Sequence, residues 1–365
     1  MFDSFDHQCM ALALQQAALG LDTTHPNPRV GCVLARDGKV VATGWHQRCG
    51  EAHAEVHALQ QAGPAARGAT AYVSLEPCSY QGRTPACAPQ LIEAGISRLV
   101  CASVDPNPRV NGKGISLLES AGIRVDTGLM KDQAESLNAG FYKRMREGLP
   151  WVRVKLAQSI DGGTALSNGL SQWISSSESR ADVQNWRARS AAIMTGIGTV
   201  LADDPCLNVR SDNTSRQPLR VIVDSQWRTP ANARTLGLDG EVLIAGNEGL
   251  EIPLALKDSG AELLALASKS GRVDLSRLMQ ALADRSVNEV QVEAGSTLSG
   301  ALIAEKLVDE ILIYQAPVLL GSGTRGSFKF GPLDDMDDAI QMNWIESTRI
   351  GNDMRLRLKP VYPQD

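Results

Sequence analysis

The fold of the first part of this chain is decided by two stretches, His53-Ala-Glu55 and Leu75-Glu-Pro-Cys-Ser-Tyr-Gln-Gly-Arg-Thr-Pro-Ala-Cys87. The first stretch opens a helical pattern, and the second begins at the end of an apolar run that is typical of a strand. Histidine nitrogen and two thiolates are ligands that zinc prefers, and three protein ligands leave the fourth tetrahedral position to water. The pattern therefore predicts a catalytic zinc site formed by His53, Cys78 and Cys87.

Glu55 is the expected proton carrier of this site, because zinc deaminases combine such ligands with a glutamate that does not bind the metal. Successive helical residues turn by about 100°, so His53 and Glu55 serve one site only if His53 stands at the helix entry. Pro85 and Pro89 likewise predict that Cys87 lies near a helix start, where the dipole favours a thiolate. Eight residues separate the two cysteines, in place of the usual Pro-Cys-x-x-Cys. A structural zinc site or two buried cysteines remain as alternatives, although a structural site does not need Glu55.

Composition places further limits on function. A chain of 365 residues with 43% hydrophobic residues is expected to form two globular domains, and a net charge of −5 argues against a nucleic-acid-binding surface. All five histidines lie at or before His57, and six of the seven cysteines lie before residue 102, so soft-ligand metal chemistry belongs to the first part. Neither a membrane span nor a secretory signal is recognisable, and we expect a cytoplasmic protein without a disulfide framework.

Strand and helix patterns alternate on both sides of Gly148-Leu149-Pro150, and an α/β fold of two domains, 1–147 and 148–365, is expected. In the first domain we expect helices at Phe5–Leu19, His53–Ala62, Gly114–Ala121 and Lys131–Arg146, and strands at Val30–Ala35, Val40–Trp45, Thr70–Leu75, Arg98–Ser103 and Ile123–Asp126. In the second domain we expect strands at Trp151–Leu156, Ala192–Thr195, Leu219–Asp224, Glu241–Ala245, Glu289–Val292 and Glu310–Pro317.

The second domain carries weaker signals. Gly196-Ile-Gly-Thr199 lacks the third glycine of a dinucleotide-binding fingerprint, since position 201 is leucine. The run from Val292 to Ala301 places an apolar strand before a glycine and hydroxyl-rich helix start, which suits a pyrophosphate. An ordinary strand–turn–helix junction explains the same run equally well.

The whole chain resembles the bifunctional deaminase–reductase family of riboflavin biosynthesis. The resemblance rests on residues 75–87, Thr24-His-Pro-Asn-Pro28, Asp105-Pro-Asn-Pro108, Lys155-Leu-Ala-Gln-Ser-Ile-Asp-Gly162, Ser171-Gln-Trp-Ile174, Thr199-Val-Leu-Ala-Asp-Asp-Pro205 and Val292-Glu-Ala-Gly-Ser296. It implies a cytidine-deaminase-like three-layer domain followed by a dihydrofolate-reductase-like domain that pairs into a homodimer or larger homo-oligomer. It also implies Zn²⁺ and NADPH as cofactors, and a phosphorylated pyrimidine as the small-molecule substrate. The first reaction replaces the C2 amino group of 2,5-diamino-6-ribosylamino-4(3H)-pyrimidinone 5′-phosphate by oxygen, and the second reduces the ribosyl group to ribityl.

The resemblance also assigns contacts. It places the deaminase substrate on Asn27, His46, Arg83, Asp105 and Asn107. It places the nicotinamide cofactor on Ala157, Trp173, Thr199, Asp203, Ser225, Gly295, Ser296, Thr297, Leu298, Ser299, Gly300 and Ala301, and the reductase substrate on Ser171, Arg187, Leu207, Arg210 and Glu293. Arg83, Arg187 and Arg210 suit phosphate groups, and Lys155 and Asp161 are placed to hold the opened sugar. Ser225 with nearby Arg228 would favour a 2′-phosphate.

Three other functions compete with this interpretation. One is a deaminase of a nucleic-acid base in tRNA or single-stranded DNA with a non-catalytic second domain, which the acidic charge and the lack of a basic, aromatic-rich stretch oppose. Another is a zinc-stabilised scaffold without activity, which an intact Glu55 opposes. The third keeps the deaminase and makes the second domain a non-catalytic partner.

Overall fold

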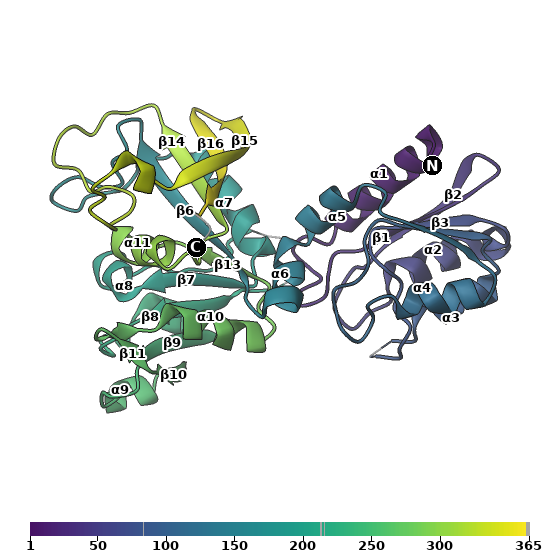
Figure 1. Ribbon diagram of the computed structural model, residues 1–365. Helices are drawn as coiled ribbons and strands as arrows, with labels where there is room; N and C mark the ends of the chain where they lie inside the picture. Colours follow the sequence, from purple (N-terminus) through teal and green to yellow (C-terminus); the bar gives the residue numbers. More distant parts are fainter. Residues whose placement is uncertain (83, 212–213, 215, 363–365) are drawn as a thin grey trace. The chain divides into compact units, whose positions relative to one another are not determined.

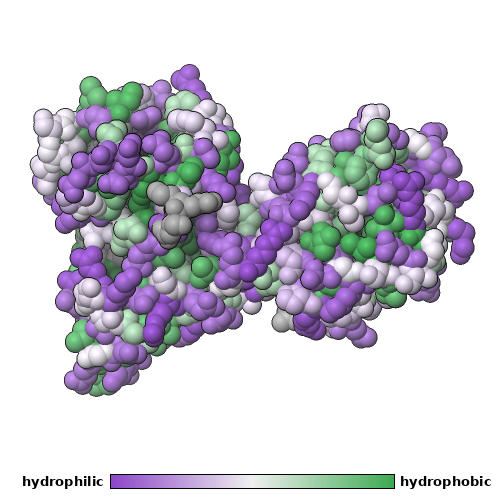
Figure 2. All heavy atoms as spheres, in the orientation of Figure 1, coloured by the Kyte–Doolittle hydropathy of each residue, from purple (hydrophilic) through white to green (hydrophobic). Residues whose placement is uncertain are grey.

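A computed structural model describes residues 1–82, 84–211, 214 and 216–362. The chain forms two compact units, Met1–Gly148 and Leu149–Asp365 (Figure 1). Within the described residues, no helix is both long and apolar enough to cross a membrane. The visible face of each unit is largely hydrophilic, with apolar residues in small patches (Figure 2), as expected if most apolar side chains are buried in the cores.

The first unit is a five-stranded sheet between two layers of helices. The strands are β1 (Gly31–Arg36), β2 (Lys39–Trp45), β3 (Thr70–Val73), β4 (Arg98–Cys101) and β5 (Arg124–Thr127), in the order β2-β1-β3-β4-β5. The helices are α1 (Ser4–Ala18), α2 (Ala54–Ala62), α3 (Cys87–Ala94), α4 (Lys113–Ser120), α5 (Lys131–Leu137) and α6 (Ala139–Glu147), with a short 3-10 turn, η1 (Gly63–Ala66). β1 pairs antiparallel with β2 and β3, whereas β3, β4 and β5 are parallel.

Alternation along the strands assigns each face of this sheet to its helices. Cys32 and Leu34 of β1 pack with residues of α2, α3 and α4, whereas Val33 and Ala35 pack with residues of α1 and α5. The face covered by α2 and α3 is the one on which the predicted zinc ligands lie, because these two helices begin beside His53 and at Cys87.

The single helix expected over 131–146 is wrong, because the structure divides it at Asn138. The side chain of Asn138 accepts a hydrogen bond from the Arg29 amide at 2.8 Å and donates one to the Arg29 carbonyl at 2.9 Å. This buried pairing with a distant segment holds Asn138 at φ −117° and ψ 25°, outside the helical region, so α5 ends and α6 begins there.

The second unit is built on a nine-stranded sheet in the order β10-β9-β8-β7-β13-β6-β14-β16-β15. Its strands are β6 (Trp151–Ser159), β7 (Ala192–Gly196), β8 (Leu219–Val223), β9 (Val242–Asn247), β10 (Glu262–Leu266), β13 (Glu289–Val292), β14 (Glu310–Ala316), β15 (Gln341–Ile350) and β16 (Asp353–Val361), and a separate small hairpin joins β11 (Ser268–Lys269) to β12 (Arg272–Val273). From β10 to β14 all neighbours are parallel, and β16 and β15 extend the sheet antiparallel. The sequence patterns indicated neither β10 nor the two last strands.

Helices cover both faces of this second sheet. They are α7 (Ser177–Arg189), α8 (Ile197–Asp203), α9 (Leu254–Lys257), α10 (Leu275–Asp284) and α11 (Ser296–Ala304), with 3-10 turns η2 (Arg234–Gly237) and η3 (Met336–Asp338). Residues of α10 and α11 share one core with β6, β7 and β13, whereas α7 and α8 belong to separate cores. The loops that connect the parallel strands to the covering helices lie at the carboxyl ends of these strands. Open α/β sheets bind their ligands at this edge.

Candidate active sites

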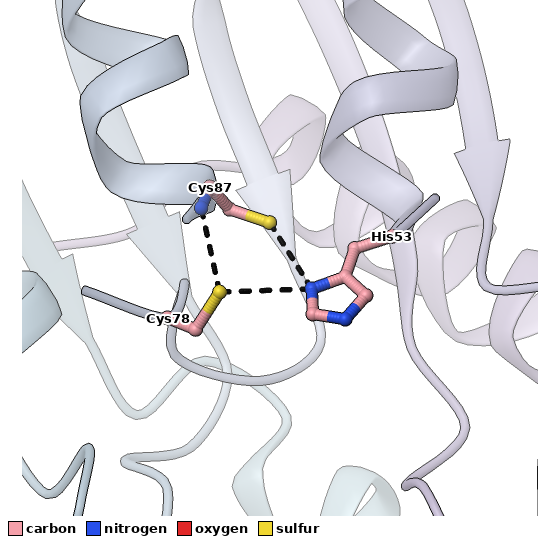
Figure 3. A group of neighbouring side chains, drawn as sticks. All are labelled: His53, Cys78 and Cys87. Carbon is pink, nitrogen blue, oxygen red and sulfur yellow. Dashed lines mark hydrogen bonds between the residues drawn. The ribbon is translucent and has the colours of Figure 1, made fainter. Parts of the chain in front are cut away.

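Three side chains from separate elements meet in the first unit. His53 is the residue that caps the start of α2, Cys87 is the first residue of α3, and Cys78 lies in the loop after β3. His53 Nδ1 lies 3.2 Å from Cys87 Sγ and 3.6 Å from Cys78 Sγ, so that the three groups point toward one common point (Figure 3). Their ligand atoms all lie within 4.8 Å of one another. Three soft donors at this separation have the composition and closeness of a zinc site.

The electrostatics of the cluster favour a metal-binding thiolate. A hydrogen bond with Cys87 and the neighbouring His53 lower the pKa of Cys78 to about 4. The Cys87 amide, at the start of α3, donates to Cys78 Sγ at 3.3 Å. Cys87, which shares its proton with Cys78 and is buried, has a raised pKa. Divalent zinc would replace the shared proton and leave both sulfurs as thiolates.

Glu55 lies buried beside these ligands, with only 3% of its surface exposed. Burial raises the pKa of its carboxyl group, while His53 opposes the rise and the Cys87 thiol hydrogen-bonds to the carboxylate. The geometric condition set by the sequence is met, since His53 precedes the first turn of α2 and Glu55 lies within that turn. A carboxyl group held next to the metal position is suited to carry protons.

Asn27 and His46 adjoin the ligand cluster. The His46 and His53 ring centroids are 5.2 Å apart in an edge-to-face arrangement. His46 Nδ1 lies 3.1 Å from the Ala52 carbonyl and must be its donor, which leaves Nε2 to accept from Asn27 Nδ2 at 3.0 Å. Burial lowers the pKa of His46, so both groups form a neutral polar wall beside the ligands.

Asp105 and Asn107 form a turn whose amide groups are ordered by their own side chains. Asp105 Oδ1 accepts from the Asn107 amide at 2.8 Å, and burial raises the pKa of Asp105 to about 7. The Asp105 amide donates to Glu76, a buried residue that the sequence reasoning missed. Its signal was an acidic residue between an apolar run and Pro77-Cys78. The remaining predicted contact, Arg83, lies outside the described residues.

The second unit contains a cavity of about 1300 Å³ beside the carboxyl edge of its parallel strands. Most of the residues expected to contact cofactor or reductase substrate line this cavity: Lys155, Ala157, Ser171, Trp173, Arg187, Thr199, Asp203, Leu207, Arg210, Ser225, Glu293, Gly295, Ser296, Thr297, Leu298 and Ala301. They come from β6, from α7, α8 and α11 and from loops, over more than a hundred positions of sequence, and the fold brings them to one hollow.

Asp161, Ser299 and Gly300 do not belong to the lining. Asp161 accepts from Ser159 Oγ and from the Leu320 and Gly321 amides, and so joins two loops. Ser299 is fully buried. A Cβ at Gly300 would lie 2.1 Å from the Lys329 carbonyl oxygen, so this glycine permits close packing of a loop rather than approach of a ligand.

Arg187 is engaged by protein groups on three of its nitrogens. Its Nε and Nη2 donate to the two Glu293 oxygens at 2.7 and 2.8 Å, and its Nη1 donates to the Asn208 carbonyl at 2.9 Å. Burial alone would raise the pKa of Glu293, but Arg187 and Lys155 lower it to about 2. The expected phosphate clamp at Arg187 is therefore also a buried ion pair that fixes Glu293 as an anion.

Comparison with known protein families and relatives decides between the candidate functions. Residues 3–103, which include all three ligands, match the zinc-binding region of cytidine and deoxycytidylate deaminases, and residues 150–356 match the RibD C-terminal domain. The riboflavin biosynthesis protein RibD of Escherichia coli is 47% identical, covering 97% of this chain and 99% of the relative. The chain belongs to the RibD family.

Structures of RibD proteins agree over the full length. Acinetobacter baumannii RibD, form 1, has a TM-score of 0.91 at 43% identity, covering 98% of this chain and 99% of that one. A diaminohydroxyphosphoribosylaminopyrimidine deaminase/5-amino-6-(5-phosphoribosylamino)uracil reductase from Thermotoga maritima has a TM-score of 0.87 at 29% identity, with 98% and 99% coverage. As a member of this family, the chain is a bifunctional deaminase and reductase of riboflavin biosynthesis. The matches give no support to a nucleic-acid deaminase.

The cavity of the second unit also contains cations that the sequence did not lead us to expect. Among its described lining residues, eight are lysine or arginine and two are carboxylic acids. Four of the arginines, Arg180, Arg234, Arg272 and Arg325, were not expected from the sequence, whereas Arg228 was expected near Ser225. Such an excess of positive charge in a cavity favours phosphorylated ligands. No local sequence motif predicts this cluster of charge, because the arginines are scattered along the chain.

Proposed function

We propose that the first domain, residues 1–147, deaminates 2,5-diamino-6-ribosylamino-4(3H)-pyrimidinone 5′-phosphate at C2, and that the second, residues 148–365, reduces the ribosyl group of the product to ribityl with NADPH. The observation that carries the first assignment is the His53–Cys78–Cys87 cluster with Glu55 buried beside it. The observation that carries the second is the strongly cationic cavity of the other unit.

His53, Cys78 and Cys87 would hold the zinc ion. Bound zinc lowers the pKa of water to about 7, which makes hydroxide available at neutral pH. Glu55 takes the proton of the attacking water and delivers it to the leaving amino group, so that ammonia departs neutral. Asn27, His46, Asp105 and Asn107 would orient the pyrimidine, and Arg83 would bind its phosphate.

The start of α11 would hold the cofactor pyrophosphate. Gly295 caps this helix without a side-chain hydrogen bond, and a Cβ there would meet no protein atom within 4 Å. Open space above unpaired helix amides suits a phosphate. Ser225, Arg228 and Arg272 line another part of the same cavity, and these groups would accommodate the 2′-phosphate that distinguishes NADPH from NADH.

Lys155 and Glu293 would hold the opened sugar against the nicotinamide, which supplies the hydride. Burial lowers the pKa of Lys155, and neighbouring Glu293 opposes that shift. Arg210, exposed at the rim of the cavity, would bind the substrate phosphate. Its guanidinium group is the better clamp, because Arg187 is already paired with Glu293.

The test is mass spectrometry of the diaminopyrimidinone ribosyl phosphate after incubation with zinc-loaded enzyme. We expect a gain of about 1 Da without reduced cofactor, from exchange of NH for O, and about 2 Da more with NADPH, with a slower second step with NADH. A first gain without the second would contradict the reductase assignment. Absence of both gains would contradict the substrate.

We also propose a homodimer formed through the second unit, in the cytoplasm. β15 is an edge strand of the sheet, on which Trp344 is 67% and Ile345 45% exposed, and uncovered apolar edges favour pairing. Seven free cysteines fit a reducing compartment. Light scattering of the wild type and of Trp344→Glu tests the assembly, and a monomeric wild type would contradict it.

A further inference from the structure

Glu76 is a buried acid that holds no predicted contact, yet it lies between two parts of the deaminase site. It is 4% exposed and comes two residues before Cys78. Its amide donates to the Ser103 carbonyl at 3.0 Å, which continues the pairing of β3 with β4 beyond the strand ends. The side chain therefore starts from a fixed backbone position.

The carboxylate of Glu76 collects four backbone amides from a single segment. Oε2 accepts from Asp105 at 3.2 Å and Gly112 at 2.9 Å. Oε1 accepts from Gly114 at 2.9 Å and Ile115 at 3.4 Å, which are in the first turn of α4. A negative charge at the start of a helix is favourable, and hydrogen bonds to a charged acceptor are stronger than neutral ones.

Close packing reinforces this attachment. A Cβ on Gly114 would lie 1.9 Å from the Pro77 carbonyl oxygen, so the start of α4 rests directly on the peptide that leads into Cys78. One side of the contact thus carries a zinc ligand. The other side carries the turn of Asp105 and Asn107, whose internal hydrogen bond of 2.8 Å keeps it in shape.

We propose that Glu76 is the positioning residue that sets the Asp105–Asn107 turn at a fixed distance from the metal ligand Cys78. A pyrimidine held by the turn then presents its amino-bearing carbon to the metal. Glu76 touches neither substrate nor metal in this proposal, and acts through the backbone. The inference rests on the proposed deaminase function, because that function assigns substrate binding to the turn.

The test is Glu76→Gln in the full-length zinc enzyme. The amide keeps one acceptor oxygen and turns an NH₂ group toward two backbone donors. We expect KM for the diaminopyrimidinone ribosyl phosphate to rise about 10- to 100-fold, the effect of losing one charge-assisted hydrogen bond, the one to the Asp105 amide of the turn. The kcat value should change less than threefold, zinc should remain stoichiometric, and reductase activity of the same preparation should be unchanged.

Two further variants keep the test decisive if Glu76→Gln misfolds. Glu76→Asp keeps the charge on a shorter arm and should restore part of the lost affinity. Asp105→Asn should raise KM by itself, and adding Glu76→Gln should add little, because both act through one turn. Full additivity, an unchanged KM, or loss of zinc with a fall in kcat alone would overturn the proposal. A wild type that does not deaminate this substrate would instead overturn the proposed function.

Discussion

The two candidate sites treat buried carboxyl groups in opposite ways. In the first unit, burial raises the pKa of Glu55 and raises that of Asp105 to about 7, with no arginine or lysine among the causes. In the second, Glu293 is also largely enclosed, with 12% of its side chain exposed, but Arg187 and Lys155 bring its pKa to about 2. The first site therefore keeps carboxyl groups that hold their protons more tightly than usual, whereas the second keeps a permanent anion.

This difference corresponds to the two reactions. Deamination moves protons between water and an amino group, and such transfer is efficient when the carrier has a pKa near the working pH. Hydride transfer leaves the chemistry to the cofactor, and asks the protein to fix geometry and charge. Pairing with Arg187 keeps Glu293 charged, whereas Glu55 has no arginine partner among the described residues and can take up a proton.

The largest expected effect is on the proton carrier. Glu55→Gln should lower deaminase turnover about 10²- to 10⁴-fold, the range for loss of a general acid–base group. Metal analysis should find zinc retained, since Glu55 is not a ligand, and reductase activity should stay at the wild-type level. A fall in zinc content would show that Glu55 supports the metal instead.

Removing the negative charge of Glu293 should lower the stability of the second unit as well as reductase activity. Glu293→Gln leaves Arg187 and Lys155 without their counter-charge, and loss of one partner of a buried pair costs about 3–5 kcal/mol. Denaturant unfolding followed by tryptophan fluorescence should report this loss, because five of the six tryptophans lie in the second unit. Deaminase activity serves as the control, and equal damage to both activities would contradict a local effect.

Low pH should affect the stability of the two units differently. Burial raises the pKa of Glu310, but Arg153 and Arg357 outweigh this effect and lower it to about 2. The pKa of Glu293 is likewise lowered to about 2. The two ionised carboxylates stabilise the fold fully above the pKa of the unfolded state, about 4.5, and this contribution is lost as the pH falls toward 2. At pH 3 each carboxylate has lost about 2 kcal/mol of its contribution to the free energy of unfolding.

The shifted pKa of Asp105 makes stability depend on pH in the opposite direction. Its pKa of about 7 lies above the model-peptide value of 3.8, so its burial costs stability at high pH and this cost is relieved as the pH falls from 7 to 4. Unfolding curves at pH 7, 5 and 3 should therefore show the second unit weakening first. Earlier loss of the first unit, measured by its zinc retention and far-ultraviolet signal, would contradict the comparison.

The smallest effects should come from two neighbouring glycines of the second unit. Gly300→Ala places a Cβ against the Lys329 carbonyl and should cost about 1–3 kcal/mol of stability, as overpacking does. Gly295→Ala meets no protein atom, so it should leave the melting temperature unchanged while weakening NADPH binding. Equal cofactor affinity for Gly295→Ala and wild type would move the pyrophosphate away from α11.

The same contrast explains what the sequence could predict. The candidate zinc ligands lie in short motifs, two at helix starts and one in the loop after a strand, so residue type and local pattern were sufficient to expect that His53, Cys78 and Cys87 lie together. The reductase cavity depends on strand order, which local patterns do not contain. Asp161 and Gly300 belong to recognisable motifs, but contacts with loops at 320–321 and 329 determine their surroundings.

Two errors in the elements have similar causes. Asn138 interrupts a good helical pattern because its side chain pairs with Arg29 on a segment far away in sequence. β15 has a mostly exposed pattern without clear apolar alternation, and its pairing with β16 is supported by charged neighbours such as Glu346 with Arg355 and Arg357. Long-range hydrogen bonds and ion pairs override local propensity in both places.

Placement of the candidate ligands at the ends of secondary-structure elements has a consequence for the loop between the two cysteines. His53 and Cys87 are set by the starts of α2 and α3, and Cys78 by the loop that leaves β3, so the metal frame does not depend on how many residues separate the cysteines. Doubling the length of a loop costs only about 0.6 kcal/mol of closure entropy. A longer loop at this position therefore adds little to the free energy of folding, and the positions of the three candidate ligands do not rely on its length.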